Sequence, residues 1–131
     1  MLADAAHVQG GKLYVLGGGF EAVRARSLPA VHRSLAIVMI LEISSQERDQ
    51  DLEVTIGLMD EDGQALDPRA NAKIRVASNT PLPPGSSTIV PLATPFHNIK
   101  FPEAKGYSFV VRHGATELGR LPLRVILEPA E

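Results

Sequence analysis

Short runs of alternating apolar and polar residues, separated by glycine and proline, dominate this chain of 131 residues. The clearest run is residues 51–60, in which one face is entirely apolar: Leu52, Val54, Ile56 and Leu58. A period of two residues is that of a β-strand buried on one face. No segment keeps the 3.6-residue period of an amphipathic helix over a helical length.

Seven other segments have the length and composition of strands: Leu2–Val8, Lys12–Leu16, Ser34–Ile43, Ala70–Ala77, Thr88–Leu92, Gly106–Arg112 and Leu118–Glu128. Turn residues separate them, with Gly10-Gly11 marking a tight hairpin. We expect residues 21–33 to be irregular, because Pro29 stops any helix there. The pattern predicts a single domain over residues 1–131, an all-β, two-sheet antiparallel immunoglobulin-like β-sandwich of seven to nine strands.

The segment Ser34–Ile43 is unusual because both of its faces are apolar. In an immunoglobulin-like order, the third, sixth and seventh strands share a sheet. The outward residues of these strands would then form one apolar patch: Val38, Ile40, Val110 and Ile126. An exposed apolar patch usually marks an interface, and a twofold homodimer or a higher homo-oligomer is the simplest result. Alternatively, residues 21–33 fold over the same face through Val23 and Leu28.

Composition excludes several classes of protein. The net charge of −2 argues against nucleic-acid binding, and no apolar run approaches the roughly 18 residues of a membrane span. The absence of cysteine leaves no disulfide and no thiolate metal site. The first residues lack the basic and apolar regions of a signal peptide, so we expect a cytoplasmic protein.

The residues that could carry chemistry each have a simpler structural explanation. Gly17–Gly19 follows a strand but lacks the spacing of a phosphate-binding loop. No two of the four histidines have metal-ligand spacing, although a Ser-His-Asp triad assembled in space stays open. The acids Asp49, Asp51, Asp60 and Asp62 could line loops at one end of the sandwich and bind Ca²⁺, or they could be ordinary turn residues.

Charge is divided into blocks along the chain. Residues 22–41 and 68–102 contain basic residues and no acid, whereas residues 42–67 contain nine acids and only Arg48 as a base. Such blocks could face a charged partner or a second subunit. They could equally balance one another within the folded chain.

The N-terminal sequence resembles that of a family of small bacterial proteins of unknown function. The shared features are an opening Met-Leu-Ala-Asp and the run Gly11–Phe20, which reads Gly-Lys-Leu-Tyr-Val-Leu-Gly-Gly-Gly-Phe. An Asp-Gly hairpin at Asp62-Gly63 and a Gly-x-Tyr-x-Phe strand at Gly106–Phe109 extend the resemblance. It implies a stand-alone bacterial β-sandwich and supplies no catalytic residue.

Together these observations predict a non-enzymatic β-sandwich that self-associates and binds an unidentified protein partner. We expect no cofactor, no metal ion, no nucleic acid and no membrane. Two alternatives remain at this point. One is a sandwich that binds Ca²⁺ or a small ligand through its acidic loops, and the other is a structural subunit of a larger bacterial or phage-derived assembly.

Overall fold

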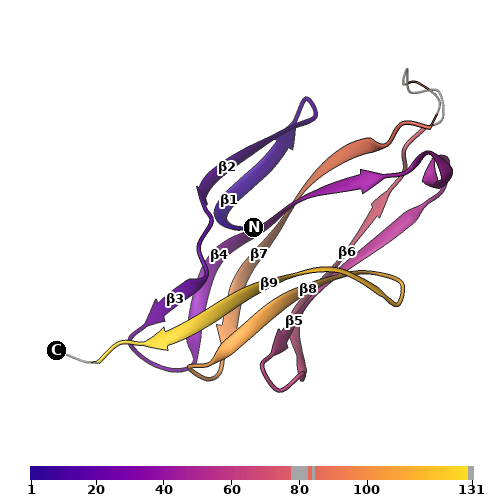
Figure 1. Cartoon of the computed structure of the whole chain (residues 1–131). Helices are drawn as coiled ribbons and strands as arrows, with labels where there is room; N and C mark the ends of the chain where they lie inside the picture. The colour runs from indigo at the N-terminus through magenta and orange to yellow at the C-terminus, as the bar shows by residue number, and fades with distance from the viewer. Residues whose placement is uncertain (78–82, 84, 130–131) are drawn as a thin grey trace.

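Two β-sheets make up the computed structural model, which describes residues 1–77, 83 and 85–129 (Figure 1). Sheet A has the order β2 (Lys12–Gly18), β1 (Leu2–Gln9), β4 (Ala30–Ile43) and β7 (Thr88–Phe101). Sheet B has the order β3 (Ala22–Ala25), β9 (Thr116–Leu127), β8 (Gly106–His113), β5 (Leu52–Asp60) and β6 (Ala65–Ile74). The only helical element in this part of the chain is a 3₁₀ turn at Ser45–Glu47.

The core lies between the two sheets and is built from the alternating inward residues of each strand. Phe96 on β7 stacks on Phe109 on β8, with ring centroids 5.7 Å apart. Phe101 on β7 meets the ring of Tyr107 on β8 edge-on at 5.0 Å. Because each pair joins sheet A to sheet B, these aromatic rings hold the two layers together. The apolar face predicted for residues 51–60 is buried, as expected.

The all-β, two-sheet prediction is confirmed, and the nine strands of the described residues match the upper end of the predicted number. Two details differ. β3 and β9 run parallel, so sheet B is not wholly antiparallel. β7 continues to Phe101 rather than ending at residue 92, and its edge position explains why it accommodates Pro91 and Pro95.

The prediction that residues 21–33 are irregular is wrong. This segment contains β3 and the beginning of β4. β3 pairs with β9 and extends sheet B, so it does not fold over the outer face of β4. Val23 packs against the core between the sheets.

The predicted grouping of strands is also wrong. β4 belongs to sheet A, whereas β8 and β9 belong to sheet B. Alternation identifies the two faces of a strand but not its neighbours, which depend on long-range pairing. The structure therefore confirms two β-sheets but not the immunoglobulin-like strand order from which this grouping was predicted.

One side of the sandwich has unpaired strand edges. β1 pairs with β4 only at Leu2 and Ala3, opposite Ile37 and Ala36. β3 pairs with β9 only over residues 124–127. Within the described residues, no strand pairs with β4 at 39–43 on the side away from β7, or with β9 at 116–122 on the side away from β8. We call this region the open side.

Candidate functional site: the open side of the sandwich

The structure separates the four residues predicted to form one patch. Val38 and Ile40 lie on β4 in sheet A, whereas Val110 and Ile126 lie on β8 and β9 in sheet B. Val38 and Val110 are each only 4% exposed, Ile126 is half-buried, and Ile40 is 62% exposed. The single chain therefore has no patch made of these four residues, and only Ile40 is fully available at the surface.

Val38 and Ile40 also differ in their backbone pairing, because only Val38 bonds to Met1. Met1 and Val38 exchange two backbone hydrogen bonds: the nitrogen of Met1 donates to the Val38 carbonyl at 2.6 Å, and the Val38 amide donates to the Met1 carbonyl at 2.8 Å. No described strand continues this pairing beyond Val38. Ile40, two residues further along the same face, has no such backbone partner among the described residues, and its side chain is exposed.

An apolar cleft of about 430 Å³ follows the open side. Its walls come from three parts of the fold: Met1 and Leu13, residues 38–41 of β4, and Val111 with residues 118–121. A second hollow of about 250 Å³ shares Ile40, Leu41 and Leu118 with it and reaches Glu42 and Glu47. The open side is thus an apolar surface with acidic residues at one end.

The exposed Leu118 is a part of this surface that the sequence did not indicate. Leu118 is the extra residue of β9 where its pairing with β8 shifts, since Val111 is opposite Gly119 and Arg112 is opposite Glu117. A bulge of this kind redirects a side chain outward. Nothing in the local alternation marks this position, because the shift depends on the partner strand.

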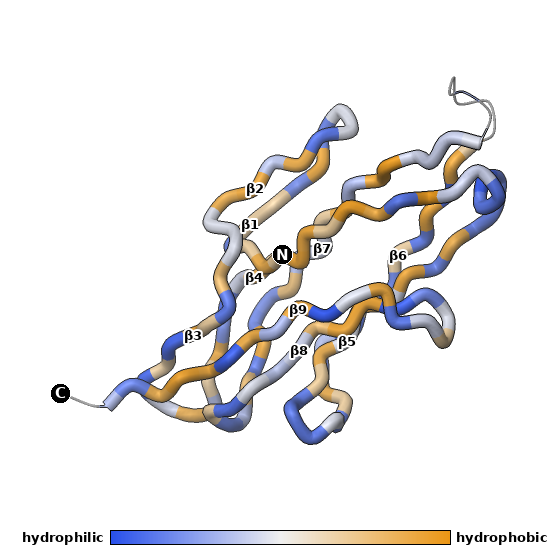
Figure 2. The backbone as a smooth tube through the Cα atoms, in the orientation of Figure 1, coloured by the Kyte–Doolittle hydropathy of each residue, from blue (hydrophilic) through white to orange (hydrophobic). Residues whose placement is uncertain are grey.

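The β1–β2 hairpin carries a second group of exposed apolar residues. It was predicted around Gly10-Gly11 and is confirmed by the pairing of residues 3–9 with 12–18. Leu16 is 72% exposed, and Tyr14 is exposed and stacks on His7 with ring centroids 5.0 Å apart. Figure 2 shows the hydrophobic stretches of this hairpin, whose tip points away from the sandwich. The exposure itself could not be read from the alternation.

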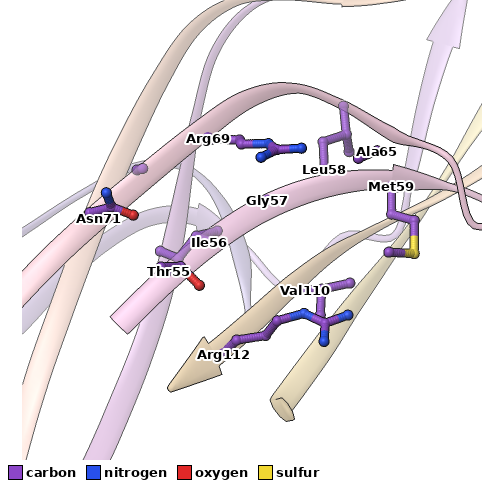
Figure 3. Close-up of a pocket in the computed structure, with 11 residues that line it drawn as sticks. Thr55, Ile56, Gly57, Leu58, Met59, Ala65, Arg69, Asn71, Val110 and Arg112 are labelled. Atoms are coloured by element: carbon purple, nitrogen blue, oxygen red, sulfur yellow. The ribbon is translucent and has the colours of Figure 1, made fainter. Parts of the chain in front are cut away.

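A hollow of about 450 Å³ that contains two arginines lies on the outer face of sheet B (Figure 3). Gly57 leaves a gap in the outward side chains of β5, and Arg69 and Arg112 stand on either side of it. Neither arginine takes part in an ion pair with another described residue. Guanidinium groups favour carboxylates and phosphates. Because Arg69 is exposed to water, however, this hollow by itself defines no ligand.

The acids proposed as Ca²⁺ ligands are not gathered together. Asp49 and Asp51 precede β5 and Asp60 ends it, so the two groups lie roughly 30 Å apart along an extended strand. The expectation that they line one end of the sandwich is wrong. Among the described residues, no three His, Cys, Asp or Glu side chains are close enough together to hold a metal ion.

Asp60 instead has a structural role at the β5–β6 hairpin. Its carboxylate accepts backbone hydrogen bonds from Gln64 at 2.9 Å and Asp62 at 3.0 Å, and the ammonium of Lys105 lies 3.1 Å away. The Gln64 bond, followed by Lys105 and Asp62, lowers the pKa of Asp60. Hydrogen bonds to Glu103 and then Asp60 raise the pKa of Lys105. These contacts tie the hairpin to the β7–β8 connection.

This cluster gives stability a dependence on pH. A carboxylate whose pKa is lowered by folding stabilises the fold above its unfolded pKa, and this contribution is lost as the pH falls through the folded value. We therefore expect the melting temperature to fall below about pH 4. In Asp60→Asn the melting temperature should be lower at pH 7 and the loss in acid shallower. Thermal melts between acidic and neutral pH measure both.

Asp62→Asn is the matched control. The Asp62 carboxylate lies 3.7 Å from the same Lys105 ammonium but is exposed to water, so the two substitutions differ in burial. This variant should melt like the wild type at every pH. Equal effects of the two substitutions would show that the burial of Asp60 contributes nothing.

Packing and backbone contacts account for Gly17 and for two of the histidines, His113 and His32. Gly17 has a φ of +63°, and a Cβ there would collide with the Asp4 carboxylate. A side chain is therefore excluded at the base of the hairpin, whether or not a ligand is present. His113 contacts the Glu53 carbonyl through Nδ1 at 2.9 Å, and His32 lies against Phe20.

The charge blocks are partly balanced within the chain. Arg75 pairs with Asp51 at 3.3 Å, which joins a basic block to the acidic one. Arg24, in the other basic block, pairs with Glu128 at 3.6 Å. All four side chains are largely exposed, so these pairs contribute little stability.

Comparison with known families places the chain in one of them. A model of a family of unknown function (DUF6941) matches residues 1–126, and the chain belongs to this family. No curated protein and no solved structure gives a significant match. In the part of the chain that the structure describes, no helix has the length and apolar character needed to cross a membrane.

Proposed function

We propose that this protein is a non-enzymatic interaction module that self-associates through its open side. The observation that carries the proposal is the exposure of Ile40 beside an apolar cleft with unpaired strand edges. Apolar surface of this kind is stabilised by being covered, and an interface between copies covers it on both molecules at once. The bacterial origin and the cytoplasmic location expected from the sequence belong to the same proposal.

The total surface of the chain supports self-association. The chain exposes 8196 Å², whereas a compact monomer of its 14.1 kDa mass exposes roughly 6,700 Å². A standard interface removes about 800 Å² from each partner. The difference between the two areas is therefore larger than the area that one partner loses in such an interface.

The hairpin provides a surface for the second part of this function, which is the binding of another protein. Tyr14 and Leu16 lie on the same face of β2 and are exposed. Aromatic and large aliphatic side chains of this kind form the centres of protein interfaces. We propose this face of the hairpin, and not the open side, for the heterologous partner.

Sedimentation velocity from low to high micromolar concentration tests the self-association. We expect a concentration-dependent dimer. A strict monomer throughout this range would contradict the proposal. A closed assembly of many copies would favour the alternative of a structural subunit, and electron microscopy would show its shape.

A further inference from the structure

The backbone of β4 presents unpaired hydrogen-bonding groups at the open side. Val38 exchanges two backbone hydrogen bonds with Met1, which shows that its N–H and its C=O both point away from β7. In a strand the direction of these groups alternates from residue to residue. The pairing of β4 with β7 is in continuous register from residue 34 to 43, so Ile40 and Glu42 direct their groups the same way as Val38.

No described residue bonds to the backbone of Ile40 or Glu42 on this side. Ile40 and Leu118 flank this edge with exposed apolar side chains, and the cleft runs alongside it. An edge with free backbone groups and apolar neighbours is a template for another strand. The strand that fits must be extended, must reach residues 39–43, and must stop where Met1 already occupies β4.

We propose that this strand is β4 of a second copy, paired antiparallel with the first across a twofold axis at Leu41. This inference rests on the proposed self-association and specifies how it occurs. In this register Ile40 lies opposite Glu42 of the second copy, and each exchanges its N–H and C=O bonds with the other. The two four-stranded sheets A then become one continuous sheet.

The twofold arrangement accounts for the ends of the contact. β4 ends at Ile43, and Met1 takes the edge at Val38, so the free edge is short and centred near Leu41. A twofold axis at that point uses the same few residues of both copies, as an isologous interface requires. The exposed Ile40 and Leu118 of each copy come to lie beside the joint. The surface that the chain exposes beyond that of a compact monomer, about 1,500 Å², exceeds the roughly 800 Å² that a standard interface removes from each partner.

Glu42 offers a second way to examine this register. A charge on an exposed edge strand is also a common protection against pairing. In the proposed register Glu42 lies opposite Ile40, so like charges are not directly opposed, but the two carboxylates approach each other diagonally. Removing this charge should therefore tighten the dimer.

Ile40→Pro, compared with Ile40→Thr, tests the strand pairing. Proline removes an N–H that faces the open edge, where the fold of the monomer does not use it. Threonine shortens the apolar side chain but keeps the N–H. Sedimentation equilibrium should give a dissociation constant roughly 30-fold weaker for Ile40→Pro than for Ile40→Thr, because one backbone bond is lost from each copy.

Each outcome of this experiment distinguishes the two proposals. A monomeric wild type contradicts the self-association itself. A dimeric wild type with equal constants for the two variants shows that the copies meet without pairing of β4, and this overturns only the further inference. Glu42→Gln serves if Ile40→Pro does not fold. This substitution should lower the dissociation constant of the dimer by up to about tenfold. An unchanged or higher dissociation constant would overturn the pairing.

Discussion

Phe109→Ala is expected to destabilise the fold by about 3–5 kcal/mol, the usual cost of truncating a buried phenylalanine. Phe109 has no exposed surface and stacks on Phe96 of the opposite sheet. Its removal leaves a cavity at the contact between the two layers, which extended strands cannot close by a small shift. Urea unfolding should show a lower midpoint with an unchanged slope.

Two controls frame this result. Phe109→Leu retains most of the buried volume and should cost less than about 1.5 kcal/mol. Leu127→Ala removes an exposed side chain at the end of β9 and should change stability by less than about 0.5 kcal/mol. All variants must be compared at the same protein concentration, because self-association adds to the apparent stability of the fold. A loss in Phe109→Ala no larger than that in Phe109→Leu would contradict this account of the core.

Val38→Asp and Ile40→Asp are expected to have opposite consequences, although the two residues lie on one face of one strand. Val38 is only 4% exposed, so an aspartate there would be a largely buried charge. The cost is on the order of 3–5 kcal/mol. Ile40 is exposed, so Ile40→Asp should leave the unfolding midpoint of the monomer within about 0.5 kcal/mol of the wild type.

The same two variants should also differ in folding and in oligomeric state. Ile40→Asp should be a folded monomer in sedimentation velocity, because its charge lies at the proposed joint. Val38→Asp should be largely unfolded under the conditions in which Ile40→Asp is folded. If Val38→Asp kept the wild-type midpoint and only lost the dimer, Val38 would belong to the exposed patch that the alternation predicted.

The hairpins and faces of this fold were predictable because they depend on near neighbours in the sequence. Gly10-Gly11 supplies the positive φ that a tight turn requires, and both glycines adopt it. The alternation over residues 51–60 identified the buried face of β5, since an amphipathic strand has one face that avoids water. In residues 21–33 the strand β3 is only four residues long, too short for its alternation to be a clear signal, and its parallel pairing with β9 is not visible in the local sequence.

The candidate site was less predictable than the fold. Of the four residues of the predicted patch, only Ile40 is exposed as expected, and whether it lies in an interface stays a prediction. The other three residues are buried or half-buried, and two of them lie in the other sheet. Val110 is covered on the outer face of sheet B, where a hollow over Gly57 has formed beside it. The exposure of Leu118 follows from a register shift between β8 and β9.

Three properties of this protein could be predicted from its sequence alone: its all-β class, the positions of several turns, and the strand faces that avoid water. These properties follow from the two-residue period of a strand and from the conformations that glycine and proline favour. The identity of neighbouring strands, the burial of outward residues and the position of unpaired edges depend on contacts between distant parts of the chain, so they are visible only in the folded protein. Because the last of these depends on where β1 and β3 stop pairing, the open side around Ile40 exists only in the folded chain.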